Sequence, residues 1–345
     1  MITDLRLQQF RSYKDESFEF GDGVNIIVGP NASGKTNLLE AILVLARGGS
    51  YRAKDVELVQ FTKPWARLDA HTDNGLRTMK LLTEPRPSKN YELDGKPYQR
   101  LSLQHTLPTV LFEPNNLLML TGIPDARRLY LDDLLEQTRP GYGAVRQRYR
   151  RTLAQRNSLL KKGHQVAATQ IFPWNLRLGE LAGTIVRARL ELVAAMNKRI
   201  SKLYKDLSHG TNRATITYQP MFNPDNYETE LLKKLEASLE LDTLRGFTAH
   251  GPHREDFATL LDKHPVQTSA SRGEARTLTL ALKIIELQIL EAARGSRPLL
   301  LLDDVFSELD GARRHALTDH LQPYQTVITT TDADVVMQHF MNKCN

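Results

Sequence analysis

The chain of 345 residues contains a single cysteine, Cys344, which stands next to its last residue. One thiol excludes an internal disulfide framework and a zinc site built from several cysteines. Long apolar runs are also missing, since no stretch approaches the ~18 residues that a membrane-spanning helix needs. Asp4 and Arg6 interrupt the apolar core that an N-terminal export signal would require. These absences predict a protein of the reducing cytoplasm without a membrane partner.

Internal repeats, low-complexity tracts and sustained heptads are absent as well, so no coiled coil is expected. The remaining composition is that of an ordinary folded protein with 41% apolar residues, and its length predicts about two domains. Lys and Arg number 46 against 40 Asp and Glu, and the resulting net charge of +6 favours a polyanionic partner.

A glycine-rich segment, GPNASGKT at 29–36, separates an apolar run from an apolar, helix-forming stretch and matches the phosphate-binding pattern G-x-x-x-x-G-K-S/T. Gly29 and Gly34 would let backbone N–H groups turn toward phosphates, and the following helix would direct its positive end at them. Lys35 would bring a positive charge to the β- and γ-phosphates of a nucleotide, and the Thr36 hydroxyl would bind Mg2+. The residues predicted to bind nucleotide are Gly29, Pro30, Asn31, Ala32, Ser33, Gly34, Lys35 and Thr36.

Alternation of apolar and polar residues predicts strands at 2–9 and 17–20, and a third at 24–28 completes a small N-terminal sheet that delivers the glycine-rich segment. The helix after that segment is expected to end at the glycine pair 48–49. Residues 56–110 alternate short apolar segments with turn signals, which is typical of antiparallel hairpins.

The middle of the chain reads as two long helices, 139–162 and about 175–207, separated at 172–173 by Phe-Pro. The first contains eight Arg or Lys and no acidic residue, so it forms either a solvated helix face or a surface that contacts nucleic-acid phosphates. The candidates for DNA contact are Arg146, Arg148, Arg150, Arg151 and Arg156. Tyr142 and Tyr149 could stack on bases, but packing is the favoured use of both.

The run LLLLDD at 299–304 is typical of a buried parallel strand, which we expect beside the glycine-rich segment. Asp303 at its end would reach Mg2+, either directly or through water, and would pair with Thr36. Asp304 would face the γ-phosphate and orient or deprotonate the attacking water. Taken alone, such a run is equally compatible with a strand followed by a turn, and its weight comes from the glycine-rich segment elsewhere in the chain.

Ahead of that run, SRGE at 271–274 begins an apolar-periodic helix, so Ser271 and Gly273 form an N-cap that could also bind an anion. By itself this is an ordinary helix cap. The order of phosphate loop, cap and strand-end aspartates is that of ATP-binding cassette (ABC) ATPases, in which the cap residues reach ATP held by the other protomer. The segment SELD at 307–310 then occupies the D-loop position, and the strand 326–332 should end near the same phosphate.

The chain resembles the RecF recombination mediator family of bacteria nearly from end to end. The matching segments are FRSY at 10–13, GPNASGKTNLLEAI at 29–42, VLFEPNNLLMLTGIPDARRLYLD at 110–132, YRRTLAQRN at 149–157, HGPHREDF at 250–257, SRGEARTLTLALK at 271–283 and LLLLDDVFSELD at 299–310. The phosphate loop and the cap identify only the ABC superfamily. The segments 110–157 and GPHRED are more particular to RecF, and they carry the resemblance.

This resemblance implies an α/β fold, a P-loop NTPase of the ABC type whose mixed sheet has an N-terminal antiparallel part. It implies an ATPase lobe at 1–110 and 245–345 with an inserted, mainly helical lobe at 111–244. RecF-like proteins bind ATP and Mg2+, dimerise around two nucleotides, and bind gapped DNA or single-strand/double-strand junctions. With RecO and RecR they place RecA on gapped DNA, in the cytoplasm at the nucleoid, in DNA replication, recombination and the SOS response. Ser271, Gly273 and Glu274 would contact the partner copy's ATP.

Several positions depart from the usual ABC pattern. Asp304 replaces the glutamate that most ABC ATPases place after the strand aspartate, as also in RecF, and its shorter side chain predicts a slow ATPase that serves as a dimerisation switch. Glu274 stands where a glutamine often follows the cap glycine. The switch-loop histidine is missing, which leaves Thr330 or Thr331, and the Q-loop region offers Glu113 without an obvious glutamine.

Two other functions share the phosphate loop. The nucleotide-binding motor subunit of an ABC transporter would need membrane partner chains, and it gives no reason for the acid-free basic block. A P-loop kinase of small molecules would not need the cap at 271–274. The sequence therefore favours an ATP-gated DNA-binding protein of recombinational repair, with the transporter subunit as the alternative.

Overall fold

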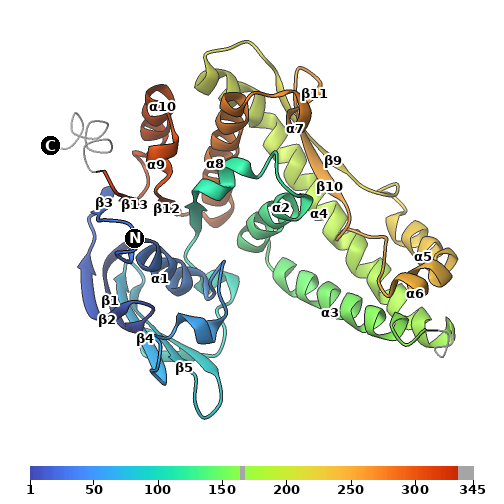
Figure 1. The fold of residues 1–345 in the computed structure, drawn as a ribbon, viewed down its shortest axis with the longest axis horizontal. Helices are drawn as coiled ribbons and strands as arrows, with labels where there is room; N and C mark the ends of the chain where they lie inside the picture. The colour runs from blue at the N-terminus through green and yellow to red at the C-terminus, as the bar shows by residue number, and fades with distance from the viewer. Residues whose placement is uncertain (164–167, 333–345) are drawn as a thin grey trace. The chain divides into compact units, whose positions relative to one another are not determined.

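The computed structural model describes residues 1–163 and 168–332, and the chain divides into two compact units (Figure 1). Unit 1 combines residues 1–117 with the described residues from Glu286 onward, and unit 2 spans 118–285. Cys344 lies outside the described residues. Within the described part of the chain, no helix is both long and apolar enough to cross a membrane.

The two boundaries between these units differ from the boundaries at 110 and 245 expected from the resemblance. Residues 245–285 pack with the insert because β10 (Asp256–Leu261) pairs with β9 (Ala214–Gln219) of the helical region. The second boundary falls inside helix α8 (Arg272–Arg294), so one continuous helix belongs to both units.

Unit 1 contains a six-stranded antiparallel sheet with the order β2-β1-β4-β5-β6-β7. Its strands are β1 (Ile2–Phe10), β2 (Tyr13–Glu19), β4 (Trp65–Thr72), β5 (Gly75–Leu82), β6 (Ser88–Leu93) and β7 (Lys96–Tyr98). The turns predicted between 56 and 110 join β4 to β5, β5 to β6 and β6 to β7, which confirms the hairpins. The buried residues of β1 are Ile2, Leu5, Leu7 and Phe10, and they place one face of the sheet on the core, with a register shift between Ile2 and Asp4 that interrupts the period-2 pattern.

A second sheet of unit 1 has four parallel strands in the order β3-β13-β12-β8. They are β3 (Val24–Val28), β13 (Thr326–Thr330), β12 (Leu299–Asp303) and β8 (Thr109–Phe112). All five residues of β12 are buried, as the apolar run predicted. The end of β12 lies beside the glycine-rich segment, as expected, because the Thr36 hydroxyl bonds Asp303, while in the sheet β13 pairs with β3 and separates it from β12. Parallel strands all end at one edge of the sheet, and the candidate site lies there.

Helix α1 (Lys35–Arg47) packs against both sheets of unit 1, and its residues 38–46 are all buried. It ends at Gly48, whose φ of 88° satisfies a left-handed C-cap as the glycine pair predicted. The predicted α/β fold with an antiparallel N-terminal part is confirmed, with its parallel and antiparallel strands in separate sheets. The remaining helical elements of this unit are η1 (Asp55–Leu58), η2 (Leu103–His105), α9 (Val305–Glu308) and α10 (Gly311–Leu321).

Unit 2 is mainly helical around the 41-residue helix α4 (Ala168–Ser208), which packs on α3, α5 and β9. Its other helices are α2 (Pro124–Thr138), α3 (Tyr142–Leu160), α5 (Tyr227–Ala237), α6 (Leu239–Arg245) and α7 (Val266–Ser269), and η3 (Pro114–Leu118) leads into it. β9, β10 and β11 (His264–Pro265) form an antiparallel sheet. The sequence analysis did not predict β9. The predicted break at Phe172-Pro173 is wrong, because Pro173 lies inside α4 and the helix continues through it.

Candidate functional site

The glycine-rich segment connects the end of β3 to the start of α1, as a phosphate loop must. Gly34 has a φ of 101°, and a Cβ there would lie 3.0 Å from the Ser12 hydroxyl oxygen and 3.1 Å from the Tyr13 hydroxyl oxygen. At Gly29 a Cβ would lie 2.8 Å from the Ser33 hydroxyl oxygen. Position 34 therefore favours glycine for its backbone conformation, and a side chain at Gly29 would require the Ser33 hydroxyl to move.

Lys35 folds back over the loop instead of extending into solvent. Its Nζ donates hydrogen bonds to the carbonyl oxygens of Gly29, at 2.6 Å, and Pro30, at 2.9 Å. An ammonium group has three donors, so one N–H remains for a phosphate oxygen in the loop. The first N–H groups of α1 point toward the same place, because α1 begins at Lys35 itself.

Thr36 joins the loop to the end of β12. Its hydroxyl donates to Asp303 Oδ1 at 3.1 Å, across 267 positions of sequence. The same Oδ1 accepts a second hydrogen bond, of 2.8 Å, from the Thr329 hydroxyl on β13. The predicted pairing of Thr36 with Asp303 is thus present in the structure.

A hydroxyl next to a carboxylate at a phosphate loop is the donor set that suits Mg2+, which binds one or two protein oxygens and completes its shell with phosphate oxygens and water. Among residues 1–163 and 168–332 no group of three or more His, Cys, Asp or Glu could hold a metal by itself. Thr36 and Asp303 would therefore hold the ion together with the nucleotide, so the residues present fit Mg2+ and do not form an independent metal centre.

Asp304 follows β12 with a φ of 51°, in the left-handed region that a residue with a Cβ adopts at a cost. Its N–H donates to the Thr329 carbonyl oxygen at 3.1 Å, and its Oδ1 lies 2.9 Å from the Ser307 hydroxyl in the predicted D-loop. The carboxylate is half-exposed at the edge of the sheet. Asp310, at the end of that loop, caps α10 by accepting a hydrogen bond from the Arg313 N–H.

The FRSY turn supports the phosphate loop, a role that the sequence did not suggest. The Tyr13 hydroxyl donates to the Gly34 carbonyl oxygen at 3.0 Å, and the Asn37 amide donates to the Ser12 hydroxyl at 3.0 Å. Arg11 binds Glu40 of α1 through two hydrogen bonds of 2.9 and 3.0 Å. The turn thus binds both the loop and the first turns of the helix that follows it.

Glu40 is the buried anchor of this arrangement, with no exposed surface. It also accepts hydrogen bonds from Arg52, at 2.9 Å, and from Ser50, at 2.5 Å. Burial alone would raise the pKa of Glu40, but the hydrogen bonds from Arg52, Arg11 and Ser50 outweigh it and lower the pKa to about 2. Glu40 therefore remains charged at any physiological pH.

Tyr51 and Glu113 lie at the same edge of the sheet. Glu113 follows β8 directly, one position beyond the pairing of Phe112 with Leu302, so it is level with Asp303. Burial, followed by the nearby Glu113 carboxylate, raises the pKa of the Tyr51 hydroxyl. Neither Tyr51 nor Arg52 belongs to a motif that the sequence exposes, and only the packing of the segment after α1 brings them here.

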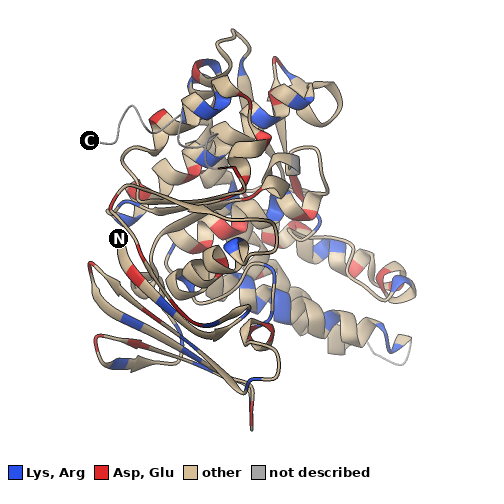
Figure 2. Ribbon diagram, turned by 60° about the vertical axis from the view of Figure 1, so that its left-hand side comes forward, with Lys and Arg blue, Asp and Glu red and all other residues tan. Residues whose placement is uncertain are grey.

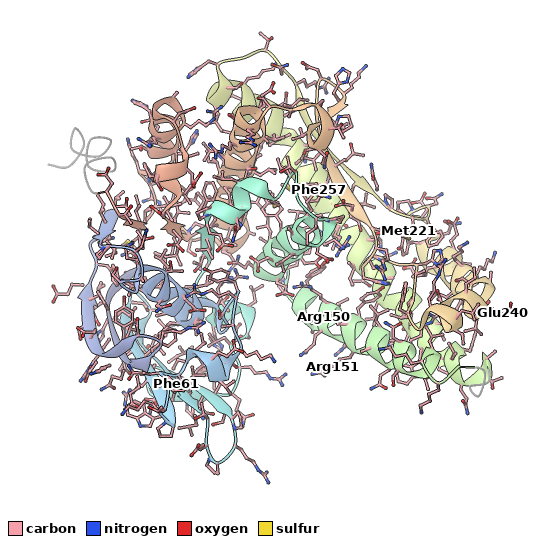
Figure 3. The ribbon with its side chains drawn as sticks, viewed as in Figure 1. Phe61, Arg150, Arg151, Met221, Glu240 and Phe257 are labelled. Carbon is pink, nitrogen blue, oxygen red and sulfur yellow. The ribbon has the colours of Figure 1, made fainter. Side chains whose placement is uncertain are left out.

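A cavity of about 480 Å³ adjoins the start of α1. Its lining includes Arg11, Ser12, Asn37, Val56, Gln60 and Phe61. Phe61 is 90% exposed and labelled in Figure 3, so a large aromatic ring of this lining stands in solvent. Most of its lining residues are polar.

The cap predicted at 271–274 is formed as a capping box in unit 2. The Ser271 N–H donates to the Glu274 carboxylate at 2.8 Å, and the Glu274 N–H donates to the Ser271 hydroxyl at 3.2 Å. Ser271 is exposed and Gly273 half-buried. On β13, the Thr329 hydroxyl contacts Asp303, while the Thr330 hydroxyl contacts Asp332. The choice of Thr330 or Thr331 as the residue near the phosphate stays a prediction.

The candidate DNA-contacting arginines separate into three groups. Arg148, Arg150 and Arg151 are exposed along α3, which carries blue basic segments in Figure 2, and Figure 3 shows Arg150 and Arg151 projecting from it. Arg146 is partly buried and paired with Asp132 and Glu136. Arg156 forms the third group.

Tyr142 and Tyr149 of the same helix are only 3% and 4% exposed, which confirms that both are used in packing.

Arg156 corrects the prediction made for it. Its side chain is completely buried, and its guanidinium binds Asp242 and Thr248, each at 2.8 Å, and Asn175 at 2.7 Å. A buried, paired guanidinium cannot contact a phosphate, so the basic block contains a structural arginine among its surface arginines. In the sequence, only the spacing of Arg156 from the exposed arginines of α3 could have indicated that it is buried.

The segment GPHRED also has an internal role. Gly251 has a φ of 127°, and a Cβ there would lie 2.6 Å from the Tyr149 hydroxyl oxygen. The same hydroxyl lies 2.7 Å from Nδ1 of His253, whose pKa burial lowers to about 4. Asp256 accepts a bidentate hydrogen bond from the buried Arg127. The segment therefore holds α2 and α3 to the sheet of unit 2.

Comparison with known proteins gives the family of this arrangement. The family model "RecF/RecN/SMC N terminal domain" matches residues 1–344. A protein named "DNA replication and repair protein RecF" from Acetivibrio thermocellus is 33% identical over 348 residues, covering 97% of this chain and 94% of that protein. A protein of the same name from Heliobacterium modesticaldum is 35% identical over 342 residues, covering 96% and 92%.

Solved structures agree with the sequence matches. The structure of "the recombination mediator protein RecF-ATPrS in RecFOR pathway" superposes with a TM-score of 0.88 at 30% identity, covering 97% of this chain and 94% of that one. The head of an SMC protein bound to the C-terminal winged-helix domain of ScpA superposes with a TM-score of 0.56 at 16% identity. The match covers 98% of this chain and 92% of that one, which shows a shared fold.

Proposed function

Because this chain belongs to the RecF family, we propose that it is an ATP-dependent DNA-binding protein of recombinational repair. It would bind ATP with Mg2+, dimerise around two nucleotides, and bind gapped DNA or single-strand/double-strand junctions in the cytoplasm, at the nucleoid. The description of a solved relative as part of the RecFOR pathway supports RecO and RecR as partners in loading RecA. Membership of the RecF family argues against the two alternatives, the motor subunit of a transporter and a small-molecule kinase.

The observation that carries the nucleotide-binding part is the hydrogen bond of 3.1 Å between the Thr36 hydroxyl and the Asp303 carboxylate. It places the two protein oxygens suited to Mg2+ beside the loop that would cradle the phosphates. Bound Mg2+ would supply charge neutralisation between the phosphates. Lys35 and the backbone N–H groups of the loop would bind the phosphate oxygens, and the half-exposed Asp304 would orient the attacking water.

Asp304 also supports slow turnover. An aspartate ends about one methylene short of where the usual glutamate of ABC ATPases would end, and a hydrogen bond of 2.9 Å to Ser307 further restrains it. A poorly placed base gives little acceleration. ATP would then act as a switch for dimerisation more than as a fuel.

DNA binding is predicted to depend on Arg148, Arg150 and Arg151 together, which are all exposed on α3 and have no acidic partner among the described residues. Replacing all three by alanine should weaken binding to gapped DNA by at least about tenfold. It should also reduce the slope of log K against log salt by about 2 to 3, roughly one unit for each phosphate that is no longer neutralised. Electrophoretic mobility shifts at several salt concentrations, with and without ATP, measure both quantities.

The matched control removes three exposed basic residues of α4, Lys198, Arg199 and Lys202. It lowers the net charge by the same amount, so a loss caused only by total charge would be equal in the two variants. An unchanged salt slope in the α3 variant would refute DNA contact by Arg148, Arg150 and Arg151. An equal loss of DNA affinity in both variants would show that only the total charge matters.

Dimerisation is predicted to need the exposed cap of α8. Ser271→Arg should leave ATP affinity in the monomer within about twofold and abolish ATP-dependent dimerisation, because the added side chain would block the cap from ATP bound to the second copy. Light scattering with and without Mg2+–ATP measures the mass. Ser158→Arg, at an exposed position of α3, should still dimerise. A Ser271→Arg protein that dimerises with ATP would show that the cap takes no part.

A further inference from the structure

Thr329 occupies an unusual place for a threonine, on the interior strand β13 between β3 and β12, with its side chain completely buried. Its hydroxyl oxygen lies 2.8 Å from Asp303 Oδ1 and 3.4 Å from the Leu302 carbonyl oxygen. A hydroxyl has one proton, and the carboxylate is the closer and charged acceptor, so the proton is donated to Asp303.

The same threonine also holds the next carboxylate residue. The Asp304 N–H lies 3.2 Å from the Thr329 hydroxyl oxygen and 3.1 Å from the Thr329 carbonyl oxygen, so both can accept it. Asp304 has a left-handed φ of 51°, which is unfavourable for a residue with a Cβ and persists only where neighbouring contacts fix it. Thr329 supplies those contacts through both of its oxygens.

We propose that Thr329 is a positioning residue of the metal–nucleotide site, orienting the Asp303 carboxylate through its hydroxyl proton and fixing the Asp304 backbone through its oxygens. Both Thr329 and Thr36 donate to Oδ1 of Asp303, so together they would leave Oδ2 for a metal ion or its water. Thr36 could not replace Thr329, because its own hydroxyl oxygen would be needed as a ligand of Mg2+. The inference rests on the proposed nucleotide function and deepens it by assigning how the metal ligand is held.

The proposal is tested by replacing the Thr329 hydroxyl with a methyl group of similar size. In Thr329→Val, the stimulation by Mg2+ of the affinity for a fluorescent ATP analogue should fall by about 10- to 100-fold, the usual effect of losing a group that orients a metal ligand. Affinity without Mg2+ should change less than about twofold, since Lys35 and the loop remain intact. Thr329→Ser keeps the hydroxyl and should restore most of the stimulation. The readout is binding, so it does not depend on turnover.

Thr326→Val is the matched control, because Thr326 is equally buried on the same strand but donates to the Tyr324 carbonyl oxygen, at the other end of β13. It should leave the Mg2+ stimulation unchanged. Full stimulation in Thr329→Val, or an equal loss in Thr326→Val, would overturn the positioning role. If the valine variant does not fold, Thr329→Ala is compared with Thr329→Ser in the same way. A wild-type protein that does not bind the ATP analogue would instead overturn the proposed function.

Discussion

Lys35→Ala is expected to lower the affinity for Mg2+–ATP by about 100-fold. A hydrogen bond to a charged group contributes about 1.5–3 kcal/mol, and this lysine adds its positive charge next to the β- and γ-phosphates. The structure adds a second reason, because the Nζ also bridges the carbonyl oxygens of Gly29 and Pro30. Without that bridge the empty loop loses part of its preorganisation, so binding must order it as well. Isothermal titration with Mg2+–ATP measures the loss.

Lys80→Ala is the control for this variant, since Lys80 is exposed on β5 and its removal changes the net charge equally. Its ATP affinity should match that of the wild type. Lys35→Ala should retain the wild-type melting temperature within about 2 °C, because the loop lies at the surface. Tight ATP binding by Lys35→Ala would contradict the phosphate-loop assignment directly.

Arg156→Ala is expected to lower the free energy of unfolding by about 3–5 kcal/mol, the usual cost of removing one member of a buried ion pair. Arg156 and Asp242 both have fully buried side chains, 2.8 Å apart. Burial lowers the pKa of Arg156, and the paired carboxylate opposes that shift. Without the guanidinium, Asp242 would remain as an uncompensated buried charge, and Asn175 and Thr248 would each lose a hydrogen-bond partner. Denaturant unfolding followed by circular dichroism measures the change.

The neighbouring Arg151→Ala provides the comparison, because Arg151 is exposed on the same helix and its loss should change stability by no more than about 0.5 kcal/mol. The two substitutions remove the same charge from positions five apart. We therefore expect Arg156→Ala to lose DNA binding only at temperatures where unit 2 unfolds, and Arg151→Ala to lose affinity without losing stability. A stable Arg156→Ala protein with weakened DNA binding would reverse this assignment.

The basic block of α3 shows how far a count of charges can predict a surface. Eight basic residues without an acidic one correctly mark a region of positive charge, but burial is decided by which helix face meets α4, α6 and the loop at Thr248. The carboxylates that pair with these arginines, Asp132 and Asp242, lie outside the block. A local sequence window contains no information about such partners.

The sequence by itself determined the features that depend on local spacing. The phosphate loop needs glycine at fixed positions between a strand and a helix, the cap at 271–274 needs Ser and Glu three residues apart, and β12 needs a run of apolar residues because both of its faces are buried. Each of these is set by interactions within a few residues or by one burial environment, so the pattern can be recognised in one dimension.

Only the tertiary structure decided which residues from distant segments meet. The insertion of β13 between β3 and β12 places Thr329 against Asp303 and leaves Thr330 in a local turn. The packing of α1 brings the FRSY turn and Arg52 onto Glu40. Strand order and long-range ion pairs arise from the collective packing of the core, in which each interaction depends on all others being formed. The sequence therefore predicted a phosphate site, and the fold decided how the carboxylates beside it are held.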